Sequence, residues 1–134
     1  MTRGYKNNNP GNIEKSNDTF QGEITPSQDK RFKQFKNMAY GYRAMFVTLD
    51  TYRKRGLNTI EKIINTWAPA VENHTESYIN TVSKRASIDR NKALTENSGI
   101  DYVNIVSAMS FVENGVDADM GDILSGFKLQ NRIK

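Results

Sequence analysis

The pattern of residue types changes at Asn37, and this change constrains the fold more than any other feature of the chain. Residues 1–37 hold three of the nine glycines and two of the three prolines, and no apolar stripe with helical spacing runs through them. Beyond Asn37, apolar residues recur three and four positions apart, which is the period of one face of an α-helix. A chain of 134 residues fits one domain. We therefore predict a single α+β, predominantly α domain over residues 1–134, with a turn-rich β part over 1–37 and a helical part over 38–134.

The first part of the chain combines a turn cluster with a hairpin pattern. Residues 7–12 read NNNPGN, and asparagine, proline and glycine are the residues that favour turns and left-handed backbone. Residues 19–24 and 31–35 are short candidate strands, and residues 25–29 between them supply turn chemistry. This pattern predicts a small N-terminal β-hairpin.

Helical periodicity then continues to the C-terminus. Helices are expected over about 38–56, 58–67, 75–86, 102–114 and 119–127. Asn58 with Glu61 has the spacing of an N-cap and its N3 carboxylate, and Asn73 or Thr75 is expected to cap the following helix. A polar connection over residues 87–99 leaves room for a further short helix.

The inventory of reactive side chains excludes several kinds of site. The chain has no cysteine and a single histidine, His74. Disulfides and thiolate metal sites are therefore excluded, and a single histidine is too few for a histidine-based metal centre. A Ser-His-Asp triad is not expected either, because His74 has no evident partner. We expect no metal and no cofactor, and any catalysis is expected to use carboxylates.

The charge of +4 suits polyanionic partners such as nucleic acid, anionic lipid or cell-wall polymers. The basic residues are spread in short runs, however, so a solvated surface explains each run better than a polyanion-binding site does. The sequence also has no recognisable nucleic-acid-binding signature. No apolar run approaches the length needed to cross a bilayer. The N-terminus has no apolar core typical of a signal peptide, so export is expected to need a holin, a virion or a secretion machine.

Glu113 is the leading candidate for a general acid. It follows Val106, Met109 and Ser110 by seven, four and three residues, so it shares their apolar helix face. At the rim of such a face a carboxyl group loses solvation of its charged form, and a protonated acid near neutral pH is what glycosidic cleavage needs. Gly115 offers a helix C-cap just beyond it. The alternative, which spacing alone favours, is a solvated glutamate in a terminal turn.

A second candidate site is the segment from Trp67 to Thr75, which lies between two expected helices. It holds an aromatic ring, the Glu72 carboxylate and the Asn73 amide, and this mixture suits sugar binding. The alternative is that Trp67 lies in the core and that Glu72 or Asn73 caps a helix.

The turn at residues 7–12 and the hairpin supply further candidates. Asn9 and Asn12 have amide side chains suited to an N-acetyl group, although the turn alone accounts for them. Glu23 and Asp29 flank the expected hairpin turn, where surface solvation is the default expectation.

The order of these motifs resembles a family of phage virion and lysis proteins, the structural protein P5 family. Its members open with a string like RGYKNNNPGNI, found here at residues 3–13. They continue with an aromatic-x-Gly-Glu step, an Asp followed by Phe-x-x-Phe, and Gly-x-Arg-Ala. The corresponding positions here are residues 20–23, Asp29 with 32–35, and 41–44, and the match extends to about residue 85.

The same order is similar to glucosaminidases of the flagellar-muramidase type, which are lysozyme-like enzymes. There a Glu-Ser-Gly-like motif at a helix end carries the catalytic acid and precedes the Asn-rich step. In this chain Glu113-Asn114-Gly115 follows that step instead. The resemblance implies a circularly permuted lysozyme-like domain with Glu113 as the general acid. Glu72, Glu23 or the N-acetyl group of the substrate would assist it.

The resemblance further implies a phage-type peptidoglycan glycosidase that cleaves β-1,4 glycan links as a muramidase, glucosaminidase or lytic transglycosylase. Its partners would be glycan strands and other virion proteins, in a virion or in host cytoplasm before delivery to the periplasm and cell wall. The alternative is a non-catalytic virion structural or wall-binding protein of the same fold. The expected substrate-binding residues are Asn9, Asn12, Trp67, Asn73, Thr75 and Tyr78.

Overall fold

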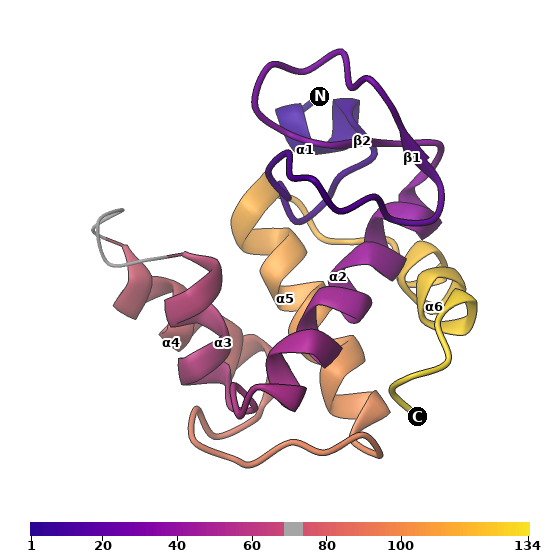
Figure 1. Ribbon diagram of the computed structural model, residues 1–134. Coiled ribbons are helices and arrows are strands. Elements are labelled where there is room, and N and C mark those ends of the chain that lie inside the picture. Colours follow the sequence, from indigo (N-terminus) through magenta and orange to yellow (C-terminus); the bar gives the residue numbers. More distant parts are fainter. Residues whose placement is uncertain (69–73) are drawn as a thin grey trace.

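The computed structural model describes residues 1–68 and 74–134, and it confirms an α+β, predominantly α fold (Figure 1). The elements are α1 (Arg3–Lys6), β1 (Glu23–Ile24), β2 (Gln34–Phe35), α2 (Met38–Lys54), α3 (Ile60–Trp67), α4 (Thr75–Ala86), α5 (Gly99–Asn114) and α6 (Met120–Leu129). Residues 1–37 form a cap above one end of α2 and α5, while α3 and α4 lie on one side of these helices and α6 on the other.

A continuous apolar core holds the helices together. The helix α2 packs against α6 and α5, and α4 packs against α5 and α3. The fully buried side chains of this core include Met45, Phe46, Leu49, Ile60, Ile63, Ile64, Val106 and Met109. Removal of this apolar surface from water is the main favourable term in assembling the helices. The helical stripes read from the sequence therefore face the interior as predicted.

Short polar side chains define where three helices begin. The side chains of Asn37, Thr59 and Asp119 each accept a hydrogen bond from a backbone N–H in the first turn of α2, α3 and α6. The expectation that Asn58 caps α3 is wrong, because its amide instead donates to the Leu94 carbonyl at 3.1 Å. The cap lies one residue later because Thr59 has the extended backbone that an N-cap needs.

The start of α4 also differs from expectation. His74 occupies the N-cap position without a side-chain hydrogen bond, and Thr75 is the first helical residue rather than the cap. Thr75 Oγ1 instead donates to the Ala68 carbonyl at 2.6 Å, which links the end of α3 to the start of α4. Asn73, the other cap candidate, lies outside the described residues. Residues 87–98 contain turns and no helix.

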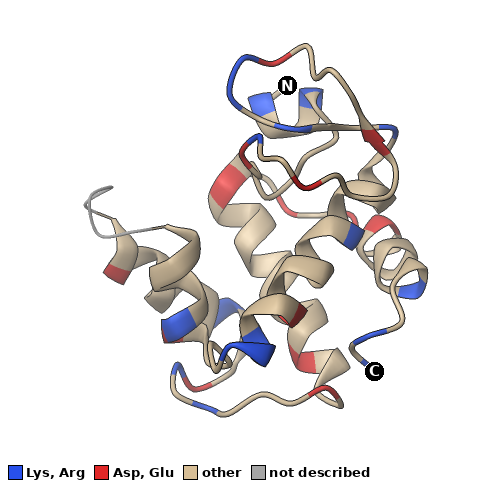
Figure 2. Ribbon diagram, in the orientation of Figure 1, with Lys and Arg blue, Asp and Glu red and all other residues tan. Residues whose placement is uncertain are grey.

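The N-terminal part contains little regular structure. The hairpin is shorter than the expected strands, since only Glu23 pairs with Phe35 and Ile24 with Gln34, in antiparallel register. An isolated antiparallel bridge joins Glu14 to Phe32. The single turn of α1 is not predicted by the sequence pattern. Charged residues of both signs are scattered over this part of the molecule (Figure 2).

The N-terminal part is joined to the helices through close backbone contacts. A side chain at Gly41 would have its Cβ 2.1 Å from the Asn8 carbonyl oxygen, so only glycine permits α2 to approach this turn. At the end of α5, the Asn114 amide donates to the Pro10 carbonyl at 2.8 Å. Among the described residues, no helix is long and apolar enough to cross a membrane.

Candidate active site

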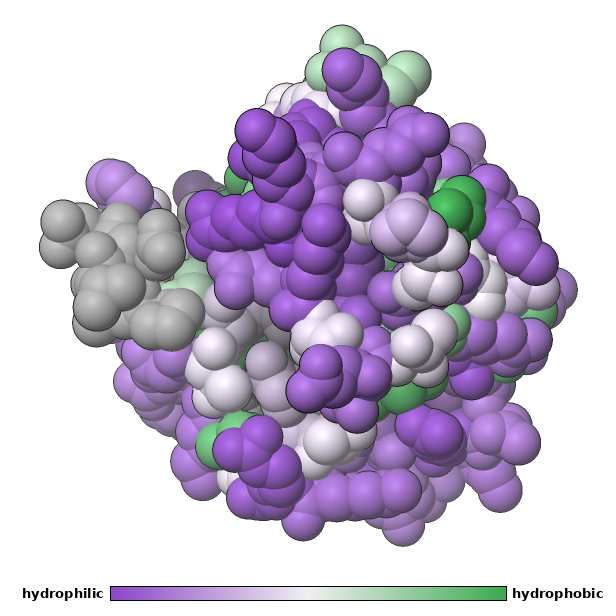
Figure 3. Space-filling view, turned by 45° about the horizontal axis from the view of Figure 1, so that its top comes forward, coloured by the Kyte–Doolittle hydropathy of each residue, from purple (hydrophilic) through white to green (hydrophobic). Residues whose placement is uncertain are grey.

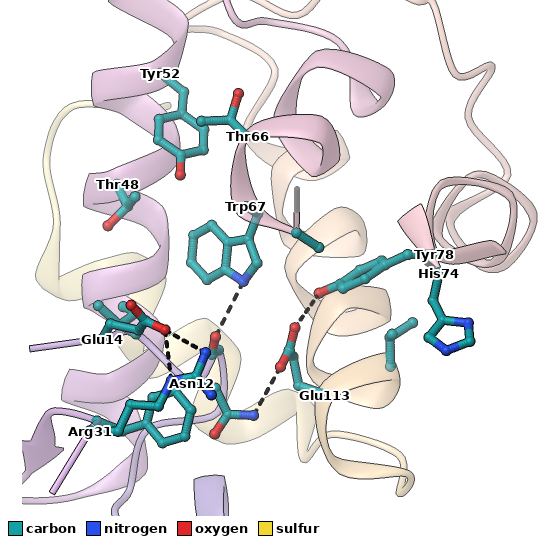
Figure 4. A pocket seen from close by; sticks show the side chains of 15 residues that line it. Asn12, Glu14, Arg31, Thr48, Tyr52, Thr66, Trp67, His74, Tyr78 and Glu113 are labelled. Atoms are coloured by element: carbon teal, nitrogen blue, oxygen red, sulfur yellow. Dashed lines mark hydrogen bonds and ion pairs between the residues drawn. The ribbon is translucent and has the colours of Figure 1, made fainter. Parts of the chain in front are cut away.

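A cavity of about 670 Å³ lies where the N-terminal part meets the helices (Figure 4). Helix α2 contributes Thr48 and Tyr52 to its lining, and α3 contributes Thr66 and Trp67. The remaining lining residues are Gly11, Asn12, Ile13, Glu14, Arg31, Phe32, Ala68, His74, Tyr78, Val112 and Glu113. Segments distant in sequence therefore converge on one space, whose walls are partly aromatic and partly polar.

Glu113 lies in this cavity at the C-terminal end of α5. Val106, Met109 and Ser110 on the same helix face are fully buried, which directs the half-buried Glu113 toward the interior. The helix ends one residue later, and Gly115 adopts the left-handed conformation with φ of 73°. Glu113 thus lies at the junction of helix and loop that the sequence predicts, while its catalytic role stays a prediction.

Within residues 1–68 and 74–134, side chains from two regions donate to the Glu113 carboxylate, one to each oxygen. Asn12 Nδ2 donates to Oε1 at 2.9 Å, and the Tyr78 hydroxyl donates to Oε2 at 2.9 Å (Figure 4). One donor comes from the N-terminal turn and the other from α4, so the carboxylate bridges two regions of the chain. Their combined hold fixes the orientation of the acid within the cavity.

Asn12 reaches the carboxylate because of its backbone conformation. Its φ of 50° is left-handed, a conformation that asparagine tolerates better than most residues. The Asn12 N–H also donates to the Asn9 carbonyl at 3.1 Å, which closes the turn. The side-chain oxygen of Asn12, Oδ1, is buried and has no hydrogen-bond partner among the described residues. The turn therefore directs the Asn12 amide group at Glu113.

Tyr78 is buried, and its hydroxyl is a persistent donor. Burial raises its pKa well above the usual value for tyrosine, and the charge of Glu113 and the hydrogen bond to it raise the pKa further. The phenol consequently keeps its proton through neutral and moderately alkaline pH. A tyrosine hydroxyl also accepts hydrogen bonds, so it can follow a change in protonation of the carboxyl group.

Trp67 forms an aromatic wall of the cavity. Its indole N–H donates to the Gly11 carbonyl at 3.2 Å, and its ring meets Tyr52 edge to face with the centroids 6.3 Å apart. A Cβ at Gly11 would lie 2.7 Å from the indole, so the glycine allows the ring to lie against the turn. Flat apolar surface beside hydrogen-bonding groups is the kind of wall against which sugar rings pack.

Comparison with known proteins gives the family of this chain. No family model matches the sequence. Over 117 residues the chain is 43% identical to Protein P5 of Pseudoalteromonas phage PM2, and the match covers 84% of this chain and 71% of that relative. The chain belongs to the P5 family of phage proteins. The P5 membership predicted from the sequence is therefore confirmed.

In this P5-family chain, four predicted site residues share the cavity, namely Asn12, Trp67, Tyr78 and Glu113. Two others have structural contacts instead. Asn9 is fully buried, and its amide donates to the carbonyls of Ile13 and Lys33. Thr75 is buried and hydrogen-bonded to Ala68, as described above. Glu72 and Asn73 lie outside the described residues.

Glu23 does not line the cavity. Both of its carboxylate oxygens lie 3.1 Å from the buried Lys33 ammonium group, which also donates to the Asp18 carbonyl at 2.7 Å. The Glu23 side chain is only 6% exposed, so the expectation of a solvated surface carboxylate is wrong. A buried charge without a partner would be costly, and the ion pair offsets part of that cost.

Asp29 likewise differs from the expected solvated surface group. Its carboxylate accepts from the Arg3 guanidinium at 2.7 and 2.8 Å and from the Asn7 amide at 3.0 Å. Backbone N–H groups of Arg31 and Phe32 donate to it as well. The Arg3 hydrogen bonds and these further donors hold the pKa of Asp29 far below its usual range.

Sequence reasoning missed Glu14 and Arg31, which both line the cavity. Arg31 Nη2 lies 2.6 Å from Glu14 Oε1, and the guanidinium group stacks over the Phe32 ring at 4.9 Å from its centroid. The position of Glu14 two residues after Asn12 was the available signal. Its pairing with Arg31 depends on the bridge between Glu14 and Phe32, which sequence spacing does not reveal.

The described residues include no group of three His, Asp or Glu side chains placed to hold a metal ion. Glu113 and Glu14 are the two carboxylates that the described part of the chain contributes to the cavity. The chemistry available in these walls is therefore that of carboxyl, amide, phenol and guanidinium groups.

Proposed function

We propose that this chain is a peptidoglycan glycosidase in which Glu113 donates a proton to the β-1,4 glycosidic oxygen. The observation that carries the proposal is the position of Glu113. It is a half-buried carboxyl group at the end of a core helix, inside a large cavity, with a donor on each oxygen. A positioned acid of this kind is the minimum that muramidases, glucosaminidases and lytic transglycosylases share.

The surroundings of Glu113 suit the proton transfer. When the carboxyl group is protonated, the Tyr78 hydroxyl can turn from donor to acceptor and keep its contact. Asn12 holds the other oxygen, so the acid keeps its direction in both protonation states. Such preorganisation lowers the cost of reaching the transition state. Trp67 and Tyr52 offer ring faces against which a bound sugar chain would pack.

Glu14 is the described carboxylate best placed to assist. It lies on the N-terminal side of the cavity, and Asn12 lies between it and Glu113 in Figure 4. Glu23 is a weaker candidate for this role because its carboxylate forms a buried ion pair with Lys33. In a hydrolase Glu14 would activate water or stabilise the developing positive charge of the sugar, whereas a lytic transglycosylase needs only the acid.

The contacts of the α5 end support a permuted lysozyme-like arrangement. The Thr2 hydroxyl donates to Asn114 Oδ1 at 2.8 Å, and the Asn114 amide donates to the Pro10 carbonyl. The acid-bearing helix end is therefore next in space to the Asn-rich turn, although Asn12 and Glu113 are 101 residues apart in sequence. In the flagellar-muramidase type of enzyme, the acid-bearing Glu-Ser-Gly-like motif is followed in sequence by the Asn-rich motif. Permutation between adjacent segments leaves such packing intact.

The test is digestion of purified peptidoglycan by the protein and by Glu113→Gln, with Glu96→Gln as the matched control. Glu96 is an exposed glutamate outside the cavity. We expect Glu113→Gln to lower the rate by about 10²–10⁴-fold and the control to leave it unchanged. Mass spectrometry of the products separates a hydrolase, which adds water, from a transglycosylase, which forms an internal anhydro ring.

Two results would overturn the proposal. Full activity in folded Glu113→Gln would remove this residue from the chemistry. Binding of peptidoglycan by the unmodified chain without any cleavage would instead support the alternative, a non-catalytic virion or wall-binding protein. Membership of a phage protein family is compatible with that alternative. The digestion assay therefore decides between the two.

A further inference from the structure

We propose that Arg31 determines specificity by binding a carboxylate carried by the glycan strand, so that the cavity selects muramic-acid-containing strands over uncharged N-acetylglucosamine polymers. This inference deepens the proposed function and rests on the cavity being the glycan site. Among the described residues that line the cavity, Arg31 is the sole lysine or arginine. Its side chain is 58% exposed, so a ligand in the cavity can reach it.

Glu14 occupies only one edge of the Arg31 guanidinium group. Nε donates to Glu14 Oε1 at 2.8 Å, and Nη2 lies 2.6 Å from the same oxygen. Within the described part of the chain, no hydrogen bond is made by Nη1. A guanidinium group has five N–H donors, so the edge formed by Nη1 and Nη2 remains for a second acceptor. A carboxylate matches that edge with two parallel hydrogen bonds.

Several contacts fix Arg31 before any ligand binds. The Arg31 N–H donates to Asp29 Oδ1 at 2.8 Å, and its carbonyl accepts from the Lys15 N–H at 2.9 Å. The guanidinium group lies over the Phe32 ring, as described above. A side chain held in this way loses little conformational freedom on binding, which favours selectivity. The face of the molecule that is seen with the N-terminal part brought forward is predominantly hydrophilic (Figure 3).

The chemistry of the strand supplies two sources for the carboxylate. Muramic acid carries a lactyl group, and in intact peptidoglycan this group is amide-linked to a stem peptide that has its own carboxylates. Amidase treatment removes the peptide and leaves the lactyl carboxylate free. N-acetylglucosamine polymers have neither group. Binding measured with intact strands, amidase-treated strands and N-acetylglucosamine polymers therefore distinguishes the contributions of the stem peptide, the lactyl carboxylate and the sugar backbone.

The chain contains a single tryptophan, Trp67, which lines the cavity, so its fluorescence reports binding directly. The experiment titrates soluble peptide-bearing strands, amidase-treated strands and N-acetylglucosamine oligomers into the Glu113→Gln protein, which prevents turnover. Arg31→Gln is then added to that background. Lys30→Gln is the matched control, because it removes the same charge from the neighbouring, exposed position outside the cavity.

We expect Arg31→Gln to raise the Kd for carboxylate-bearing strands by about tenfold, the loss typical of a charged hydrogen-bonding partner. Binding of N-acetylglucosamine oligomers should change by less than about twofold, and Lys30→Gln should leave both values close to those of the background. Loss on peptide-bearing strands alone would assign the stem peptide, and loss on amidase-treated strands alone the lactyl group. A loss in both would show that Arg31 accepts either carboxylate, that of the stem peptide or that of the free lactyl group.

Three outcomes would overturn the inference: equal weakening of charged and uncharged ligands by Arg31→Gln, an equal effect of Lys30→Gln, or no binding of any strand. Failure of the proposed function is seen separately, in the digestion assay. If the protein binds strands selectively through Arg31 but cleaves none, the recognition site stands and the glycosidase proposal falls. If the protein cleaves peptidoglycan but Arg31→Gln binds every ligand as tightly as the Glu113→Gln background does, the glycosidase proposal stands and the role of Arg31 in recognition falls.

Discussion

The N-terminal part and the helical part of this molecule are stabilised by different forces. Buried aliphatic and aromatic side chains such as Leu49, Ile63 and Met109 hold the helices together. In residues 1–37 Phe35 is also fully buried, but hydrogen bonds from polar side chains to backbone groups hold many of the turns. The Asn9 amide donates to two backbone carbonyls and accepts from one backbone N–H. The Asp29 carboxylate accepts hydrogen bonds from two segments of the chain.

This difference explains how the site is divided between the two parts. Apolar packing is non-directional, so it sets which helix face is buried and brings Glu113 to the interior. Hydrogen bonds are directional, so the polar N-terminal part can aim one amide, that of Asn12, at one carboxylate oxygen. The helices supply the acid and one of its donors, Tyr78, and the turn supplies the other donor, Asn12. Three changes test whether the two parts are as distinct as this comparison states.

The largest expected effect is in the apolar core. Leu49→Ala should lower the free energy of unfolding by about 3–5 kcal/mol, because Leu49 is fully buried and its truncation leaves a cavity. Leu124→Ala, at a position 43% exposed on α6, is the matched control and should change it by less than about 1 kcal/mol. Urea unfolding followed by circular dichroism measures both. A small effect of Leu49→Ala would show that the helices do not depend on this core.

A smaller and more local effect is expected from Asn9→Ala. Loss of its amide leaves the buried Lys33 carbonyl and neighbouring groups without partners, which costs about 1–3 kcal/mol. Amide hydrogen exchange should show lost protection at Ile13 and Lys33 while α5 stays protected. The exposed Asn65→Ala on α3 serves as the control. Equal loss of protection throughout the molecule would contradict the separation of the two parts.

The smallest expected effect is that of Asp29 on the stability of the fold at low pH. The pKa of Asp29 is held far below its usual value, mainly by the Arg3 hydrogen bonds, so its ionised form stabilises the folded state. That contribution is complete above the unfolded pKa of about 3.9 and is lost as the pH falls further toward the folded pKa. Asp29→Asn should lower the Tm at pH 7 and flatten its dependence on pH below about 4, measured by thermal scans across pH. An unchanged acid dependence in the variant would place the acid sensitivity elsewhere.

The sequence predicts those residues of the candidate site whose signal lies within one segment of the chain. It does not predict those that are brought together by pairing between segments. Glu113 was identified because its spacing from Val106 and Met109 is a property of one helix. Arg31 and Glu14 were missed because an antiparallel bridge brings them together, and no local period marks such a pairing. Residue type alone was also misleading for Asn9, since an asparagine in a turn can face a ligand or satisfy buried backbone, and burial decides between these.

The sequence by itself determined the fold class, the approximate positions of the helices beyond Asn37 and the face of α5 on which Glu113 lies, because each follows from the spacing of apolar residues along one segment. It also carried the P5 family membership. Only the tertiary structure decided that Asn12 and Tyr78 hold Glu113, that Glu23 is committed to Lys33, and that Arg31 faces the cavity. These pairings join residues far apart in the chain, so they depend on how the N-terminal part packs against the helices.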